Sequence, residues 1–354
     1  MDTKRIKAEK RKFEDLLVEL TSTDTTKLYN YIHTKLDFKR NTFPGTHNVT
    51  FLKKHFNNLL EKDYLSAEKS DGKRILLFVF KIKENAKVFC IDRTNKIYKI
   101  SNFKIKSETA LLDCEVVDLK NGDFRVLVFD CMIFENKSIV HKNLYKRLHC
   151  AELFLKNIAD QEKKLQKVLT PFNLSLKEMF KAYGFYSLYQ DRENLEHEND
   201  GIVFTPVNEE YKIGVNYSWF KWKPADLNTV DFVLKRFEGI YEMYICMKDD
   251  TKLVLFDYYF PDSFYADGLG NEEDLHDKIA EFQWMAEKEV IDPRDFTFKK
   301  GGWKLYKIRP DKRLSNSVKI VKNIIFSIEE NVQFDDLEEK YLEIRNNWKK
   351  RNNE

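Results

Sequence analysis

One lysine at a tight turn is the residue of this sequence best placed to carry chemistry. Lys69 lies two residues before Asp71-Gly72, a dipeptide typical of tight turns. The segments 63–68 and 75–82 on either side predict β-strands, so we expect Lys69 on a rigid sheet edge rather than on a free loop. A four-residue pattern of this kind also recurs by chance in ordinary hairpins with a surface lysine. Its meaning therefore depends on motifs elsewhere in the chain.

The chemistry open to such a lysine is attack on a nucleotide's α-phosphate. Only the neutral amine attacks, so the lysine pKa must fall from about 10.4 through cationic neighbours, a metal ion or burial. Lys73, Arg74, Lys221 and Lys223 would supply cationic charge if the folded chain brings them to Lys69. Attack on a polyphosphate also requires its negative charge to be neutralised, usually by a divalent metal with lysines and arginines.

Six sequence blocks occur in a fixed order, and the Lys69 segment is the first of them. Together they resemble the covalent nucleotidyltransferase superfamily and, within it, the messenger RNA guanylyltransferases, which are the capping enzymes. The segment 43–51 is also similar to the approach segment of the cellular capping enzymes. The six blocks are residues 68–74, 111–117, 128–130, 200–206, 220–224 with 228–232, and 303–312.

This resemblance implies roles for the lysine and for the acidic residues. Lys69 would form a phosphoramide with GMP and release pyrophosphate. Glu115 and Asp200 would handle the ribose or the metal, which would be Mg²⁺ or Mn²⁺, and Asp200 is the better candidate for the metal. Taken alone, each of these carboxylates would be an ordinary surface residue at a strand end.

The resemblance also implies a set of nucleotide contacts. Phe129 would stack on the guanine base, and Arg93 would contact the ribose or a phosphate. Lys221 and Lys223 alternate along a predicted strand, so both would grip one phosphate from the same side while Trp222 points into the core. The expected GTP-binding residues are Glu68, Arg74, Arg93, Glu115, Phe129, Lys221, Lys223, Arg309, Asp311 and Lys312.

The last block lies in a basic stretch from Lys299 to Arg313. A solvated basic strand and loop would explain this stretch without any ligand. In the family, however, this block belongs to a second domain. Arg309, Asp311 and Lys312 would then reach the β- and γ-phosphates only when that domain closes, and opening would release pyrophosphate and admit RNA.

Length and composition indicate a folded protein of two domains. The chain has 354 residues, of which 42% are hydrophobic and 34% charged, and this composition argues against global disorder. The expected fold class is α+β, with a nucleotidyltransferase domain of antiparallel-rich sheets and helices and a C-terminal OB-fold β-barrel lid domain. The expected limits are 1–232 for the nucleotidyltransferase domain, 233–329 for the OB-fold domain and 330–354 for a C-terminal helix.

Hydrophobic periodicity predicts the elements that position these blocks. Strands are expected at 87–92, 97–100, 110–118, 124–134, 211–224, 232–246, 252–259, 304–308 and 318–325. Helices are expected as two short pieces within 13–36, at 50–60, at 145–181 with a break at Pro171, at 271–288 after an acidic start, and at 335–348, where the helix would pack back on the protein.

Several protein classes are disfavoured. The charged start is unlike a signal peptide, and no apolar run approaches the roughly 18 residues of a membrane span, so we expect no membrane association and a nuclear location. Five cysteines without a C-x-x-C pair argue against a disulfide framework or a structural zinc site, and reduced, mostly buried thiols are expected.

The sequence therefore predicts an mRNA guanylyltransferase that uses GTP and caps 5′-diphosphate RNA. We expect a separate RNA 5′-triphosphatase and a separate cap methyltransferase, because the chain has no room for those domains. The phosphorylated C-terminal tail of RNA polymerase II would be a family-type partner. The alternatives are an ATP-dependent RNA or DNA ligase, which shares the lysine and most blocks, and a catalytically silent RNA-binding or polymerase-binding scaffold.

Overall fold

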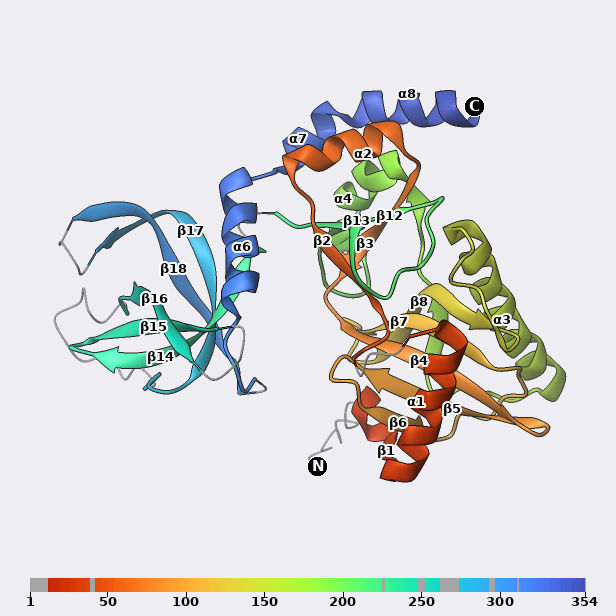
Figure 1. Cartoon of the computed structure of the whole chain (residues 1–354). Helices are drawn as coiled ribbons and strands as arrows, with labels where there is room; N and C mark the ends of the chain where they lie inside the picture. The colour runs from red at the N-terminus through yellow and green to blue at the C-terminus, as the bar shows by residue number, and fades with distance from the viewer. Residues whose placement is uncertain are drawn as a thin grey trace, which may run out of the picture. The chain divides into compact units, whose positions relative to one another are not determined.

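The chain forms two compact units in a computed structural model that describes residues 12–38, 42–224, 227–247, 252–261, 274–292, 297–310 and 312–353. Unit 1 comprises residues 1–49, 54–222 and 340–354. Unit 2 comprises residues 50–53 and 223–339. Along the chain, the long segment of unit 2 is therefore both preceded and followed by segments of unit 1 (Figure 1).

The larger sheet of unit 1 has eight strands among the described residues, in the order β1-β6-β5-β4-β7-β8-β10, with β9 paired to β8. Its neighbours are antiparallel except for β10 and β8, which are parallel. The antiparallel-rich sheet expected here is confirmed. Its strands are β1 (Leu17–Glu19), β4 (Lys73–Ile82), β5 (Asn85–Asp92), β6 (Ile97–Ile100), β7 (Ala110–Asp118), β8 (Phe124–Phe134), β9 (Lys137–Ser138) and β10 (Asn173–Leu176).

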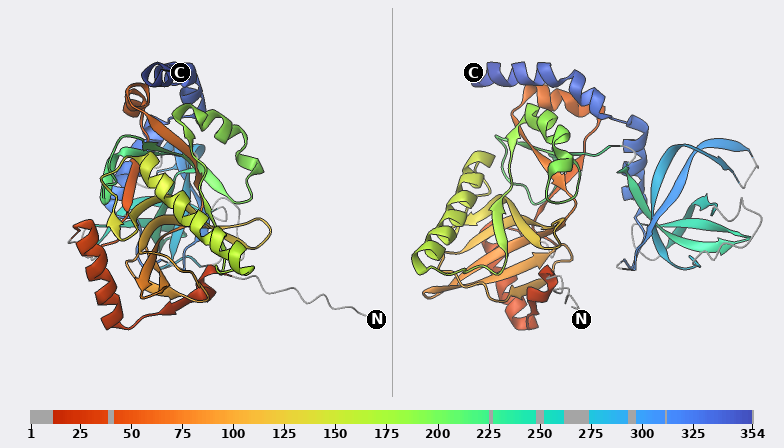
Figure 2. Two further views of the ribbon diagram at one scale, coloured as in Figure 1. Left: turned by 90° about the vertical axis from the view of Figure 1, so that its right-hand side faces the viewer. Right: turned by 180° about the vertical axis from the view of Figure 1, so that it is seen from behind.

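Helices cover both faces of this sheet. Successive residues of a strand point to opposite faces, and on β4 Leu77 packs with helix α3 (Leu144–Leu165) while Phe78 packs with helix α1 (Ser22–Leu36). Figures 1 and 2 show these two helices on opposite sides of the sheet. Burial on both faces explains why β4 is a nearly continuous apolar run in the sequence.

The second sheet of unit 1 carries Lys69. It has five strands in the order β11-β3-β12-β13-β2. The fully buried Trp222 at the end of β13 confirms that this side chain points into the core. The strands are β2 (Thr46–Thr50), β3 (Tyr64–Ser70), β11 (Phe180–Lys181), β12 (Asn199–Pro206) and β13 (Gly214–Trp222).

The expected hairpin around Lys69 is wrong, although both of its strands exist. β3 and β4 belong to different sheets, so the Asp71-Gly72 turn carries the chain from one sheet to the other. Nor is β3 an edge strand, because it lies between β11 and β12. A Cβ atom at Gly72 would lie 2.5 Å from the carbonyl oxygen of Val116, so this crossing requires glycine. The local pattern predicted the two strands and the turn but not the strands with which they pair.

Three expected helical regions differ in detail. The segment 13–36 forms the 3₁₀ turn η1 (Phe13–Leu16), the short strand β1 and one long helix rather than two helices. The helix expected at 50–60 is reduced to η2 (Lys53–His55) and α2 (Phe56–Glu61). The helix expected at 145–181 ends at Leu165, and strands follow Pro171. Further short elements are η3 (Ala182–Gly184), α4 (Phe185–Gln190) and η4 (Arg192–Asn194).

The C-terminal helix packs on unit 1, as expected. α8 (Tyr341–Asn352) buries Ile344 and Trp348, and it lies alongside α2 in Figures 1 and 2. Arg351 forms an ion pair of 2.8 Å with Asp63 and donates hydrogen bonds to the carbonyl oxygens of Leu60 and Lys62. These contacts attach the helix at the start of β3, the strand that bears Lys69.

Unit 2 contains a five-stranded antiparallel sheet in the order β16-β15-β14-β17-β18 among its described residues. One helix, α6, packs against β14 and β15. This arrangement confirms the small OB-type barrel domain expected from the sequence. The elements are β14 (Thr229–Phe237), β15 (Ile240–Cys246), β16 (Leu253–Tyr259), β17 (Ile279–Ile291), β18 (Phe298–Ile308), α6 (Val318–Glu330) and α7 (Phe334–Glu339).

Two predictions in unit 2 are wrong. The helix expected at 271–288 is strand β17 from Ile279 onward, because Ala280 and Phe282 alternate into the core; residues 271–273 lie outside the described part. The strand expected at 318–325 is helix α6. Its β-branched residues favour strands, but the spacing from Val321 to Ile328 places one apolar side of a helix on the sheet.

Other expectations agree with the described residues. The five cysteines form no disulfide, and four of them are buried. No helix in the described ranges has the length and apolar character needed to cross a membrane.

Candidate active site

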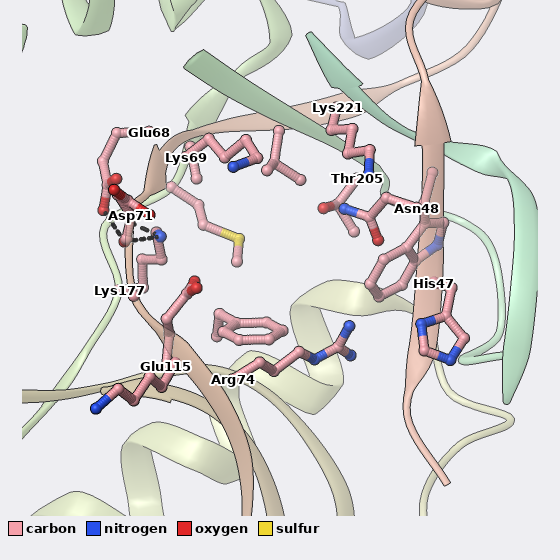
Figure 3. A pocket seen from close by; sticks show the side chains of 18 of the residues that line it. His47, Asn48, Glu68, Lys69, Asp71, Arg74, Glu115, Lys177, Thr205 and Lys221 are labelled. Atoms are coloured by element: carbon pink, nitrogen blue, oxygen red, sulfur yellow. Dashed lines mark hydrogen bonds and ion pairs between the residues drawn. The ribbon is translucent and has the colours of Figure 1, made fainter. Parts of the chain in front are cut away.

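Unit 1 contains a cavity of about 580 Å³ whose walls come from both of its sheets (Figure 3). β3 and its following turn supply one wall, β7 and β8 another, and β12, β13 and β2 a third. The cavity is lined by several residues that the sequence had singled out, namely Glu68, Lys69, Arg74, Arg93, Glu115, Phe129 and Lys221.

Lys69 is paired with the acidic residue that the sequence assigned to a metal. Its Nζ donates a hydrogen bond to Oδ1 of Asp200, and both side chains are partly buried. β12 runs antiparallel to β3, and its register shifts between Asn199 and Ile202, which brackets Asp200. A bulge of this kind redirects a side chain from its regular position. The irregular strand therefore places a carboxylate at the amine.

The Glu68 carboxylate, next to Lys69 in sequence, is held by three side chains. Its Oε1 accepts hydrogen bonds from Ser70 Oγ at 2.9 Å, Lys177 Nζ at 3.0 Å and His197 Nε2 at 3.1 Å. All four side chains are at least nine-tenths buried. Burial raises the pKa of Glu68, but the His197 hydrogen bond and the Lys177 charge outweigh it and lower that pKa to about 2. Glu68 is therefore ionised.

Glu115 faces the same cavity in a different state. Figure 3 shows its carboxylate pointing into the cavity. Among the described residues it makes no hydrogen bond or ion pair. Burial raises the pKa of Glu115, and the charges of Lys177 and Lys69 offset this only in part. A half-buried carboxylate without a direct partner would gain from a cation, so Glu115 suits a metal or a ligand donor.

Arg74 is largely engaged by other protein groups. Its Nε donates to Asp113 Oδ1 at 2.9 Å, and its two terminal nitrogens donate to Asp113 and to the carbonyl oxygen of Thr46. Tyr211 donates its hydroxyl proton to the same fully buried Asp113. The guanidinium carbon lies 5.3 Å from the centre of the Phe129 ring. Arg74 thus supports the aromatic ring, and its direct contact with a nucleotide stays a prediction.

Cations gather at the opposite wall, near His47. The pKa of His47 is lowered first by burial and then by the charges of Arg74 and Arg93, with a smaller contribution from Lys221. The pKa of Arg93 is itself lowered by burial and by Arg74. Arg93 and Lys221 thus line the cavity near His47, with Arg74 beside them. Such a wall suits an anionic ligand.

Lys221 and Lys223 differ in position. Lys221 lies on β13 and lines the cavity. Lys223 follows the end of that strand, belongs to unit 2 and is absent from the described lining. The shared phosphate grip of the two lysines stays a prediction.

The last block forms a charge cluster of its own within unit 2. Arg309 Nη1 lies 2.9 Å from Glu281 Oε2 and 3.3 Å from Asp231 Oδ1. Lys312 is also ion-paired with Asp231, whose side chain is buried. Asp311 lies outside the described residues. Arg309 and Lys312 are thus already neutralised by carboxylates of the same unit.

Sequence reasoning missed several residues of the cavity. Lys177 was assigned to a helix, although the alternation in Asn173–Leu176 could have indicated the strand that precedes it. His197 stands shortly before the block 200–206 and Asp113 lies within the block 111–117, but no local pattern signals their partners. Further lining residues outside the predicted set are His47, Asn48, Met179, Val203, Thr205 and Trp219.

No cluster of three or more histidine, cysteine, aspartate or glutamate side chains suitable for a metal occurs in the described ranges. Mg²⁺ commonly takes only one or two protein carboxylates and completes its coordination with water and substrate phosphates. Glu115 and Asp200 fit that mode, since one lacks a direct partner and the other is partly exposed beside the lysine.

Two protein families match this chain. Residues 14–225 match the family described as mRNA capping enzyme, catalytic domain, and residues 227–338 match mRNA capping enzyme, C-terminal domain.

Relatives that match along most of their own length are also named as capping enzymes. The mRNA-capping enzyme subunit alpha of Schizosaccharomyces pombe is 30% identical over 84% of this chain and 79% of its own length. The proteins of the same name from Kluyveromyces lactis and Saccharomyces cerevisiae are 28% and 26% identical over 88% of this chain, and over 80% and 81% of their own lengths. Among solved structures, a mycobacterial DNA ligase D complexed with ATP and MES aligns over 78% of this chain and 98% of its own, with 14% identity and a TM-score of 0.42.

Proposed function

Because the chain belongs to the mRNA capping enzyme family, we propose that it is an mRNA guanylyltransferase. It transfers GMP from GTP, through a covalent lysyl-GMP intermediate, to the 5′-diphosphate end of nascent mRNA. The observation that carries the proposal is the position of Lys69. Its side chain lines a cavity that is rich in cations, and it is paired with Asp200.

The first half-reaction forms the lysyl intermediate. Asp200 accepts a proton from the Lys69 ammonium along their hydrogen bond. The freed lone pair on Nζ attacks the α-phosphorus of GTP, a phosphorus–nitrogen bond forms, and the bond to the β-phosphate oxygen breaks. Pyrophosphate leaves with that electron pair.

The second half-reaction makes the cap. A terminal oxygen of the RNA 5′-diphosphate attacks the phosphorus of lysyl-GMP, and the phosphorus–nitrogen bond breaks. Lys69 recovers its proton, and the product carries a 5′-5′ triphosphate link. Asp200 stands beside Nζ in both half-reactions, so it serves as the proton acceptor of the first and the donor of the second.

A divalent ion, Mg²⁺ or Mn²⁺, would be held by Glu115 and Asp200 together with phosphate oxygens. When bound, it supplies charge neutralisation at the phosphates. The lack of any direct partner for the Glu115 carboxylate among the described residues supports its part in this pair.

The remaining contacts follow the charge distribution. Phe129 stacks on the guanine, a contact typically worth about 1–3 kcal/mol. Arg93 and Lys221 bind the ribose or phosphates, and Lys223 joins them from the end of β13. Arg309, Asp311 and Lys312 act on the β- and γ-phosphates after movement of unit 2. Glu68 and Arg74 contribute to GTP binding from the wall of the cavity, where they are hydrogen-bonded to Ser70 and Asp113.

The partners proposed for this chain follow from the family. They are 5′-diphosphate RNA, a separate RNA 5′-triphosphatase, a separate cap methyltransferase and the phosphorylated tail of RNA polymerase II, with the nucleus as the place of action. The relatives' designation "subunit alpha" supports a complex with another subunit.

The test is covalent labelling with α-labelled GTP or ATP and magnesium or manganese, followed by a denaturing gel. We expect a label from GTP alone in the wild type and none in Lys69→Ala. The matched control is Lys81→Ala, an exposed lysine on β4 outside the cavity lining, which should label normally. A label from ATP instead would identify a ligase, and no label from either nucleotide would identify the silent scaffold.

A further inference from the structure

Four buried polar side chains form a hydrogen-bonded network around the two residues that flank Lys69 on β3. Glu68 and Ser70 flank Lys69 on β3, and Lys177 and His197 come from segments that lie more than a hundred residues along the chain. Alternation along a strand points residues 68 and 70 away from the side taken by residue 69. The network therefore holds the strand on both sides of the nucleophile.

Lys177 has a defined place in this network. Its Nζ donates to Ser70 Oγ at 2.6 Å and lies 3.0 Å from Glu68 Oε1. Its side chain is 7% exposed, and it lines the cavity on the same side as Glu115 (Figure 3). These two contacts and the burial of the side chain together restrict its rotamers, so the ammonium is held at one point of the cavity wall.

His197 is the fourth member of the network. Its Nε2 lies 3.1 Å from the same Glu68 oxygen that binds Lys177, and its Nδ1 is buried with no hydrogen-bond partner. Since the ionised Glu68 only accepts hydrogen bonds, Nε2 must carry the proton. The main chain on either side is fixed too, because residue 197 bridges Leu119 and the carbonyl oxygen of Glu198 accepts from the amide of Asp71.

We propose that His197 is a positioning residue of the guanylyl-transfer site: by donating its Nε2 proton to Glu68 it fixes the carboxylate that holds the Lys177 ammonium in the cavity. The ammonium then serves as a stationary donor to an oxygen atom of the bound nucleotide. This inference rests on the proposed function for the reaction affected, but its structural part is independent of catalysis.

The chemistry of amide side chains gives a matched pair of variants. A glutamine at this position presents its Nε2 amide near the place of the histidine Nε2, whereas an asparagine presents its amide near Nδ1. His197→Gln should therefore keep the hydrogen bond to Glu68, and His197→Asn should lose it. His149→Asn, at an exposed histidine on α3, is the control for general effects of the substitution.

The first measurement is the rate at which acetic anhydride modifies Lys177, followed by peptide mass spectrometry, with the whole protein and no nucleotide. We expect slow modification in the wild type, His149→Asn and His197→Gln, and about tenfold faster modification in His197→Asn. Equal rates in His197→Asn and the wild type would overturn the proposal, whether or not the protein forms a nucleotide adduct. Failure of the proposed function would instead leave the wild type unlabelled by GTP.

The second measurement separates positioning from folding. In single-turnover adduct formation, His197→Asn should raise the GTP concentration for half-maximal rate and slow the reaction by about 10-fold to 10²-fold, since small misplacements at a reacting centre cost this much. His197→Gln should recover most of the loss at a similar melting temperature. If His197→Gln were as slow as His197→Asn while equally well folded, the Nε2 hydrogen bond would not be the cause.

Discussion

The charged groups of the two units are arranged in opposite ways. In the unit 1 cavity charge is left without direct partners, because neither Glu115 nor Arg93 makes a hydrogen bond or an ion pair among the described residues. In unit 2, Arg309 and Lys312 are paired with Asp231 and Glu281. An unbalanced site is prepared for a charged ligand, whereas a balanced one must exchange its internal partners for ligand phosphates.

This contrast assigns different duties to the two regions. The cavity would bind the nucleotide with groups that are already in place, and only the proton shared by Lys69 and Asp200 must move before attack. The second cluster would engage phosphate only where the phosphate outcompetes two carboxylates. Four predictions test this contrast, and they are ordered by the size of the expected effect.

The largest effect is expected from Lys69→Arg. An arginine keeps the positive charge and the ion pair with Asp200 but is not deprotonated in proteins, so it cannot attack phosphorus. Adduct formation should fall by about 10⁴-fold or more while GTP still binds. Covalent labelling and equilibrium binding of GTP measure the two quantities. Residual rapid labelling would mean that another residue is the nucleophile.

The next effect is expected from Glu115→Gln, which removes the unpaired charge. Adduct formation should fall by about 10²-fold to 10³-fold through loss of a metal contact. The folded-state pKa of Glu115 is raised, so its ionised form opposes folding at neutral pH, and the stability it contributes at low pH is lost as pH rises through that pKa.

The melting temperature of this variant at neutral pH should therefore equal or exceed that of the wild type. Thermal unfolding beside labelling tests both parts. A lower melting temperature would show that Glu115 has a stabilising partner and that the cavity is balanced after all.

A smaller effect distinguishes the cations of unit 2 from their carboxylates. Arg309→Ala should slow adduct formation by about 10-fold to 10²-fold through lost phosphate contact. Asp231→Asn should mainly destabilise unit 2, by about 1–3 kcal/mol, because it leaves two cations beside a buried amide.

Labelling rates and denaturant unfolding separate the two variants. Loss of stability in Arg309→Ala equal to that in Asp231→Asn would indicate that the cluster serves the fold of unit 2 and not the phosphates.

The smallest effect concerns Glu68→Gln and pH. The pKa of Glu68 is lowered to about 2, so its ionised form stabilises the fold above the unfolded value near 4.5, and that contribution is lost as pH falls toward 2. Wild type should exceed Glu68→Gln in free energy of unfolding at pH 7, and this difference should shrink by about 2 kcal/mol between pH 7 and about pH 3. Urea unfolding at several pH values measures it, and a constant difference would contradict the assigned ion network.

Local patterns sufficed where an element is defined by its own residues. β6, β7 and β8 have the predicted limits, because a strand with a buried apolar face shows a regular alternation or run. They failed where tertiary packing overrides propensity. The β-branched run of α6 forms a helix because the spacing of its apolar side chains suits the sheet of unit 2. β17 forms a strand, although the helix expected at 271–288 had an acidic start.

The sequence alone determined the order of the six blocks, the lysine at the Asp71-Gly72 turn and most of the charged residues that line the cavity. Only the tertiary structure decided that β3 and β4 enter different sheets, that Asp113 engages Arg74, and that Lys177 and His197 meet at Glu68. The physical reason is distance along the chain. Residue types and turns are local properties, whereas hydrogen bonds between segments that are 39 to 129 residues apart follow from how the sheets pair and pack.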